Sequence, residues 1–150
     1  MVVGAFNGDS FPDVAVTNSS SPSTVAVLIN DGDWSAVRPP SIRISDVAMA
    51  EGQKGTTYFV FTVTLSASYD ATVTVNFATA NGTAKTSDND YAATSGTLTF
   101  APGETTKTIT VAVKGDRKKE ANETFFMNLS GAVNALIADS QGLGTILNDD

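Results

Sequence analysis

Residues 108–130 read TITVAVKGDRKKEANETFFMNLS and contain the pattern that decides the fold. Apolar residues alternate with polar ones over residues 108–114 and again over residues 124–130. Alternation of this kind is typical of a β-strand with one buried face and one wet face. The charged segment between the two runs therefore predicts a loop that joins two strands at one end of a sheet.

The same period of two recurs through the rest of the second half of the chain. Further strands are predicted at residues 42–47, 58–65, 72–77, 96–100 and 144–147. No window shows a helical period. Seven short strands separated by turns predict an all-β fold, a seven-stranded antiparallel immunoglobulin-like β-sandwich.

Residues 1–38 differ in character from the rest of the chain. Apolar runs at 13–16 and 24–29 predict two strands, and residues 5–13 resemble the loop of an FG-GAP or VCBS-type repeat. The resemblance implies a partial β-propeller-type repeat with a weak calcium loop at Asn7, Asp9 and Asp13, or else a plain polar turn. Two prolines at 39–40 stiffen a linker, so domains are predicted at 1–38 and 39–150.

Composition and charge exclude several classes of protein. The net charge of −7 disfavours binding to nucleic acid or to an anionic membrane surface, because the wrong sign dominates. The chain has no cysteine and no histidine, which rules out disulfides, the usual zinc sites and Ser-His-Asp triads. No apolar run approaches the roughly 18 residues of a membrane span, so membrane insertion is not expected.

Carboxylates gather in two places along the chain. The charged loop holds Asp116, Glu120 and Glu123, and the sequence given finishes with residues Asn-Asp-Asp at 148–150. If both groups lie at one end of a sandwich, the crowded negative charges need a cation. Calcium could neutralise them from outside, or the three basic residues at 117–119 could do so from inside, and the sequence leaves both alternatives open.

Several motifs closely resemble the Calx-beta domain. They are Asn-Gly-Thr-Ala at 81–84, Asp-Asn-Asp-Tyr at 88–91, the run at 95–109, Glu-Ala-Asn-Glu-Thr-Phe at 120–125 and the run at 144–150. The resemblance covers residues 41–150 and implies a seven-stranded antiparallel sandwich. Members of that family occur as regulatory calcium sensors in sodium–calcium exchangers and as tandem modules of large bacterial surface or secreted proteins.

The resemblance also implies a set of calcium ligands. Carried over by position, they are Glu51, Asp90, Asp116, the backbone carbonyl of Lys118, Glu120, Asn148, Asp149 and Asp150. Gly115 and Asn148 stand where the sensors carry aspartates, which predicts a weakened site. If calcium gives no response, an aspartate restored at position 115 is expected to create one.

These observations predict a non-catalytic calcium-binding structural module. The expected setting is extracellular, in a large multi-domain bacterial surface or secreted protein, where the module rigidifies the geometry between neighbouring domains of the same chain and supports adhesion. The alternative is a carbohydrate- or protein-binding adhesion module that does not need calcium. A glycosidase pair formed by Asp116 and Glu120 is disfavoured, because nothing in the sequence indicates a cleft or an apolar pocket.

Overall fold

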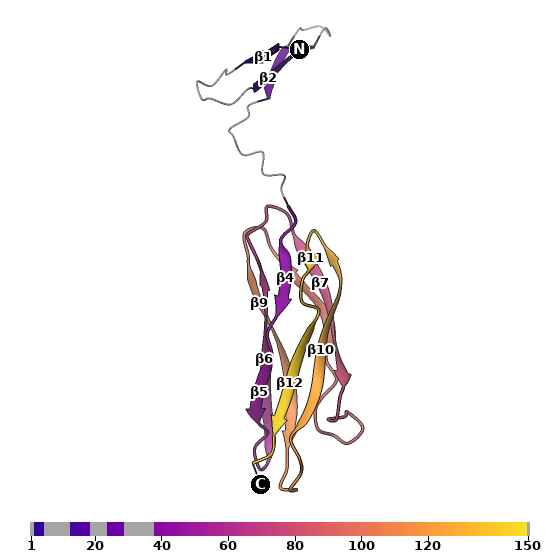
Figure 1. The fold of residues 1–150 in the computed structure, drawn as a ribbon. Helices are drawn as coiled ribbons and strands as arrows, with labels where there is room; N and C mark the ends of the chain where they lie inside the picture. The colour runs from indigo at the N-terminus through magenta and orange to yellow at the C-terminus, as the bar shows by residue number, and fades with distance from the viewer. Residues whose placement is uncertain (1, 5–12, 19–23, 29–37, 150) are drawn as a thin grey trace. The chain divides into compact units, whose positions relative to one another are not determined.

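The computed structural model describes residues 2–4, 13–18, 24–28 and 38–149 (Figure 1). The chain forms two compact units, Met1–Arg38 and Pro39–Asp150. In the first unit, an antiparallel sheet has the order β1-β2-β3, with β1 at Val2–Gly4, β2 at Asp13–Asn18 and β3 at Thr24–Leu28. Many folds contain three such strands, so the propeller-type repeat stays a prediction.

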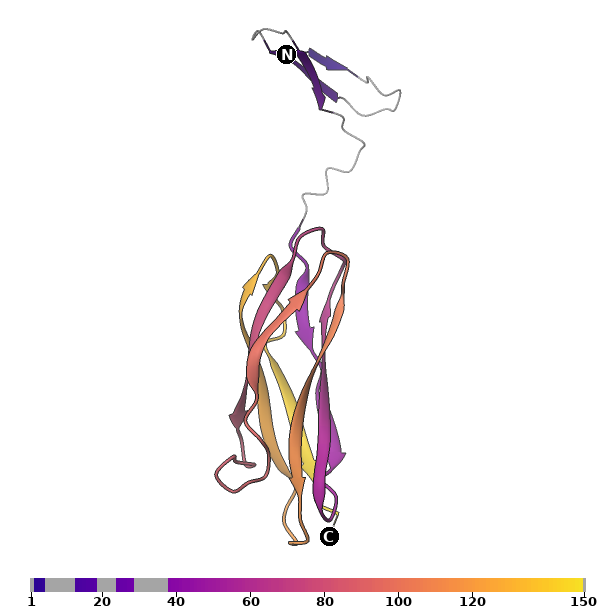
Figure 2. The same ribbon diagram turned by 180° about the vertical axis from the view of Figure 1, so that it is seen from behind.

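The second unit is a sandwich of two sheets (Figures 1 and 2). One sheet has the order β5-β12-β10-β7-β8, formed by Val47–Ala50, Gln141–Leu147, Glu123–Val133, Val73–Asn81 and Ser95–Phe100. The other has the order β11-β4-β6-β9, formed by Leu136–Ile137, Ser41–Ile44, Gly55–Leu65 and Thr106–Gly115. The predicted all-β architecture is therefore confirmed, and the described residues form no helix that could cross a membrane.

The first strand of the sandwich is divided between the two sheets. At the break, the Ser45 hydroxyl accepts a hydrogen bond from the Thr62 N–H of β6 (2.9 Å). The Asp46 carboxylate accepts one from the Leu143 N–H of β12 (2.7 Å). These two bonds fix β4 to one sheet and β5 to the other.

This division makes the prediction of a purely antiparallel sandwich wrong at two places. β5 pairs parallel with β12, and the short β11 pairs parallel with β4. Over residues 38–149 the structure has nine strands where seven were predicted, because the first strand counts twice and β11 is added. Alternation reports which face is buried, but it carries no information on strand direction or on which sheet a strand joins.

The core lies between the sheets, and the alternating residues supply it. Phe125 lies near its centre, stacked on the Tyr91 ring at 4.5 Å and 5.9 Å from the rings of Phe59 and Phe61. On residues 58–65 and 108–114 one alternate set of side chains is buried, as the period of two predicts: Phe59, Phe61, Val63, Leu65, Ile109, Val111 and Val113. Phe77 and Leu98 are only half-buried and pack against the edge of this core.

Candidate metal centre

Segments that lie far apart in the sequence meet at one end of the sandwich. The Gly52 N–H donates to the Asp149 carboxylate (3.2 Å), which joins the turn after β5 to the segment after β12. The Glu120 N–H donates to the Asn148 side-chain oxygen (3.2 Å), which joins the same segment to the charged loop. The Lys114 N–H at the end of β9 donates to the Asp90 carbonyl (2.8 Å), which brings in the loop between β7 and β8.

Three carboxylates converge at this end, and we call Asp90, Glu120 and Glu123 the acidic triplet. Each contributes one oxygen, and these oxygens lie within 4.8 Å of one another. All three side chains are half-buried. Two separate loops and the first residue of β10 therefore supply a compact set of oxygen ligands.

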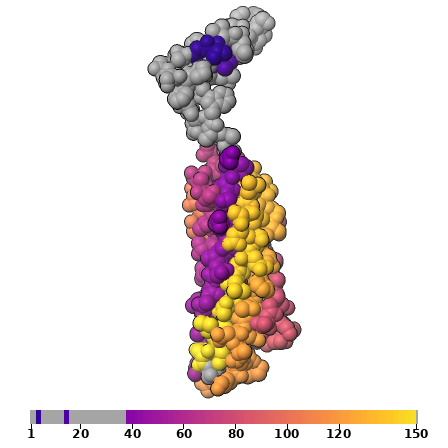
Figure 3. Space-filling view, in the orientation of Figure 1, coloured from indigo at the N-terminus to yellow at the C-terminus, as the bar shows by residue number. Residues whose placement is uncertain are grey.

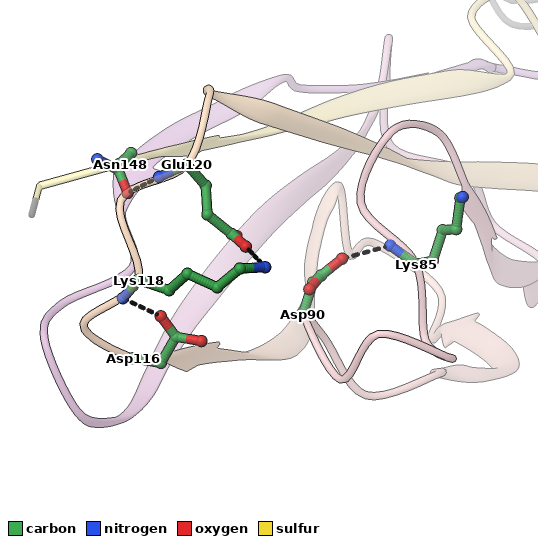
Figure 4. Close-up of polar contacts among 6 residues, drawn as sticks. All are labelled: Lys85, Asp90, Asp116, Lys118, Glu120 and Asn148. Carbon is green, nitrogen blue, oxygen red and sulfur yellow. Dashed lines mark hydrogen bonds and ion pairs between the residues drawn. The ribbon is translucent and has the colours of Figure 1, made fainter.

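Asp90 is held in place from both sides. Its carboxylate accepts the Lys85 N–H at 2.7 Å (Figure 4). The next residue, Tyr91, is buried, and its hydroxyl donates to the Asn81 side-chain oxygen at 2.6 Å. The carboxylate is thus positioned by its own loop and by a ring that belongs to the core.

The electrostatics of the triplet reflect its crowding. Burial raises the pKa of Glu123, and the neighbouring carboxylates of Asp90, Glu120 and Asp88 raise it further. A raised carboxyl pKa means that the ionised form is disfavoured there. A cation placed among these oxygens would reverse this penalty.

Lys118 supplies one such positive charge from within the chain. Its ammonium forms an ion pair with the Glu120 carboxylate, while its backbone N–H donates to the Asp116 carboxylate at 2.7 Å (Figure 4). The hydrogen bond with Glu120 is the main reason why the pKa of Lys118 is raised. The ammonium is therefore paired with one of the three carboxylates that a metal ion would use.

The calcium ligands implied by the family resemblance differ in their burial and in their hydrogen-bond partners. Glu51 is buried, with 7% of its surface exposed, and its carbonyl accepts the Thr57 hydroxyl at 2.6 Å. The Asp116 and Asp149 carboxylates accept backbone N–H groups, as described above. Only Asp90 and Glu120, among the residues that the resemblance implied, belong to the triplet.

Some predicted ligands lie outside the described residues. They are Asp150 and, in the second candidate loop, Asn7 and Asp9. Asp13 begins β2, and its side chain is not among those described. The second, weaker calcium loop thus stays a prediction.

Glu123 was counted among the loop acids but not among the implied ligands. It is the first residue of β10, two positions before the buried Phe125. Because side chains alternate along a strand, Glu123 lies on the same face as the core residues of β10. The period of two was thus the signal that could have identified it.

A family model for the Calx-beta domain matches residues 38–150. The chain belongs to the Calx-beta family. Sodium/calcium exchanger 1 of Bos taurus is 42% identical over 72 residues, which are 48% of this chain and 7% of the exchanger. Sodium/calcium exchanger 2 of Rattus norvegicus is 36% identical over 74 residues, which are 49% of this chain and 8% of the exchanger.

Solved structures show the same fold as this Calx-beta domain. The apo-form Calx CBD1 domain has a TM-score of 0.62 at 21% identity, covering 74% of this chain and 98% of that one. The calcium binding domain CBD12 of CALX1.1 has a TM-score of 0.65 at 22% identity, covering 73% of this chain and 46% of that one. The chain spans only a small part of the curated exchangers that it matches, so their transport activity is not carried over.

The residues at this end of the Calx-beta domain fit calcium. Calcium accepts six to eight oxygens in loose geometry and takes carboxylates from flexible loops. The triplet offers three carboxylates, and burial first, then the neighbouring carboxylates, raise the pKa of Glu123. A zinc site of the usual kind is excluded, because the chain has no histidine or cysteine.

Proposed function

We propose that this Calx-beta domain is a non-catalytic module that binds calcium at the acidic triplet. The observation that supports this most directly is the convergence of three half-buried carboxylates within 4.8 Å. Asp90, Glu120 and Glu123 would hold the ion. Bound calcium would supply positive charge that offsets their mutual repulsion.

The ion would stiffen the end of the domain. The charged loop and the turn after β5 both hydrogen-bond to the segment that follows β12. Fixing these loops therefore also fixes the direction in which the chain leaves the sandwich. This suits a spacer between neighbouring domains of a large bacterial surface or secreted protein, which is the extracellular setting and the adhesive role that we propose.

Lys118 would weaken the site without abolishing it. Its ammonium has to leave Glu120 before that carboxylate can bind an ion. The side chain of Lys118 is 74% exposed, so it can turn into solvent. We expect a dissociation constant of about 10⁻⁴ to 10⁻³ M, the range of extracellular calcium modules.

Thermal unfolding of the full chain in millimolar calcium and in chelator tests this function. At about ten times the dissociation constant, calcium should add roughly 1.4 kcal/mol to the free energy of unfolding. The melting temperature should then rise by about 3–6 °C. The same concentration of magnesium should have a smaller effect, because magnesium demands a stricter octahedral geometry.

A double variant, Asp90→Asn with Glu123→Gln, should lose the calcium response. The matched control is Asp70→Asn, which removes one exposed charge from the segment between β6 and β7. The control should respond to calcium as the unmodified chain does. An equal response in the double variant, or none in the unmodified chain, would refute calcium binding at the triplet.

A further inference from the structure

The first and the last strands of the sandwich run side by side in the same direction. β5 and β12 pair parallel over four positions, from Val47 with Gly144 to Ala50 with Leu147. β4 pairs parallel with β11 over two positions. Figure 3 shows the first strand in violet and the last strand in yellow, in contact along the face of the second unit.

Tension along the backbone would load this pair in shear. The chain enters the second unit at one end, near Pro39, and leaves it at the other end after β12 (Figure 1). Pulling on both ends draws β5 toward its own beginning and β12 toward its own end. Because the two strands are parallel, the forces oppose each other along the strand axis, and the interstrand hydrogen bonds must break together.

Both strands are anchored against sliding. β12 pairs with β10 over six positions on its other side. The Glu51 N–H donates to the Leu147 carbonyl (3.3 Å) and extends the parallel pair by one bond. Upstream, Ile42 and Ile44 of β4 are buried in the core, with 0% and 5% of their surfaces exposed, so sliding would expose apolar side chains to water.

We propose that the second unit is a load-bearing element, in which the parallel β5–β12 pair resists extension of the chain. The load is mechanical tension, transmitted through the backbone at both ends of the unit. The Ser45–Asp46 break contributes, because hydrogen bonds to both sheets prevent the first strand from peeling off either sheet alone. This role does not depend on calcium.

Single-molecule force spectroscopy tests the proposal, and the absence of cysteine lets engineered thiols define the pulling points. The shear arm uses Arg38→Cys and a cysteine added after residue 150. The unzipping arm uses the same added cysteine with Lys54→Cys, in the exposed turn after β5, so both handles are at one end of the pair. Both arms are run in chelator, so the result is separate from the test of calcium binding.

The unfolding force should be at least about twofold higher in the shear arm, since forced unfolding follows the barrier along the pulled direction. Two proline variants, Ala48→Pro and Met49→Pro, then locate the resistance. β5 is an edge strand, and the Glu51 N–H bonds to Leu147 of β12, so by alternation the Met49 N–H also faces β12 and the Ala48 N–H faces away. Met49→Pro should therefore lose much of the shear force, and Ala48→Pro should retain it.

Equal forces in the two arms of the unmodified chain would overturn the proposal, whatever the variants do. A directional difference that survives both prolines would also overturn it, because the resistance would then lie in another pair of strands. Thermal melting of each variant shows that it is folded before it is pulled.

Discussion

A side chain at position 115 should destabilise the sandwich, although this residue lies at the edge of the charged loop. A Cβ placed on Gly115 would lie 1.8 Å from the Gly52 carbonyl oxygen and 2.7 Å from the Glu51 carbonyl oxygen. Both are backbone atoms, so no rotamer change can relieve the contact. The turn after β5 therefore has to move.

The size of the effect follows from what that movement breaks. Cβ atoms essentially never approach closer than 3.0 Å, so the turn must shift by 3.0 − 1.8, or 1.2 Å. Such a shift disrupts the bonds from the Thr57 hydroxyl to Glu51 and from the Gly52 N–H to Asp149. Overpacking costs about 1–3 kcal/mol and each hydrogen bond about 0.5–1.5 kcal/mol, so Gly115→Ala should cost about 2–6 kcal/mol.

Urea unfolding followed by circular dichroism measures this cost. Gly103→Ala is the matched control, because Gly103 has φ of 87° and nothing within 4 Å of the added Cβ. The control should cost only the backbone penalty of about 1–2 kcal/mol. A cost for Gly115→Ala no larger than that of the control would refute the close approach of the two backbones at this position.

The same geometry corrects one expectation from the sequence. An aspartate at position 115 is expected from the sequence to create a calcium response if the unmodified chain shows none. Its Cβ would meet the same carbonyl oxygens, so Gly115→Asp should instead displace the turn and weaken the site. Calorimetric titration of this variant should therefore show no gain in calcium affinity.

Three further predictions concern the core, the surface and the charged loop. Phe125→Ala removes the ring that stacks on Tyr91 and should cost about 3–5 kcal/mol in urea unfolding. Lys107 lowers the pKa of Glu104 below its ordinary value of 4.5, so this ion pair stabilises the fold above that pH and is lost as the pH falls through the lowered pKa. Glu104→Gln should therefore lower the melting temperature at neutral pH and leave it unchanged in acid below the lowered pKa. Lys118→Gln should lower the calcium dissociation constant measured by calorimetry, because it frees a carboxylate. Lys107→Gln is the control: it also removes one positive charge, but near the start of β9, at the opposite end of that strand from the charged loop. It should not lower the calcium dissociation constant.

The buried faces of the long strands β6 and β9 could be predicted because burial and alternation are coupled within the strand itself. Phe59, Phe61 and Val111 are fully buried, as the period of two indicates. The break at Ser45–Asp46 could not be predicted, because the bonds that define it come from Thr62 and Leu143, distant in sequence. Short-range patterns carry no record of such partners.

The candidate site divides in the same way. The acids of the charged loop are visible in the sequence as a cluster, and family resemblance adds Asp90. The ion pair between Lys118 and Glu120 depends on side-chain direction in a loop, and strand periodicity says nothing about it. The tight contact at Gly115 depends on a backbone approach from another turn, and it too is invisible in composition.

Two residues of the acidic triplet are close neighbours in sequence of two aromatic residues of the core. Asp90 precedes Tyr91, Glu123 lies two residues before Phe125, and the two rings stack at 4.5 Å. An engineer who wished to retune the ion preference of this protein could not treat the loops as an interchangeable cassette. A substitution at position 90 or 123 lies one or two residues from a ring of this stack, so calcium affinity and the stability of the core would have to be measured together.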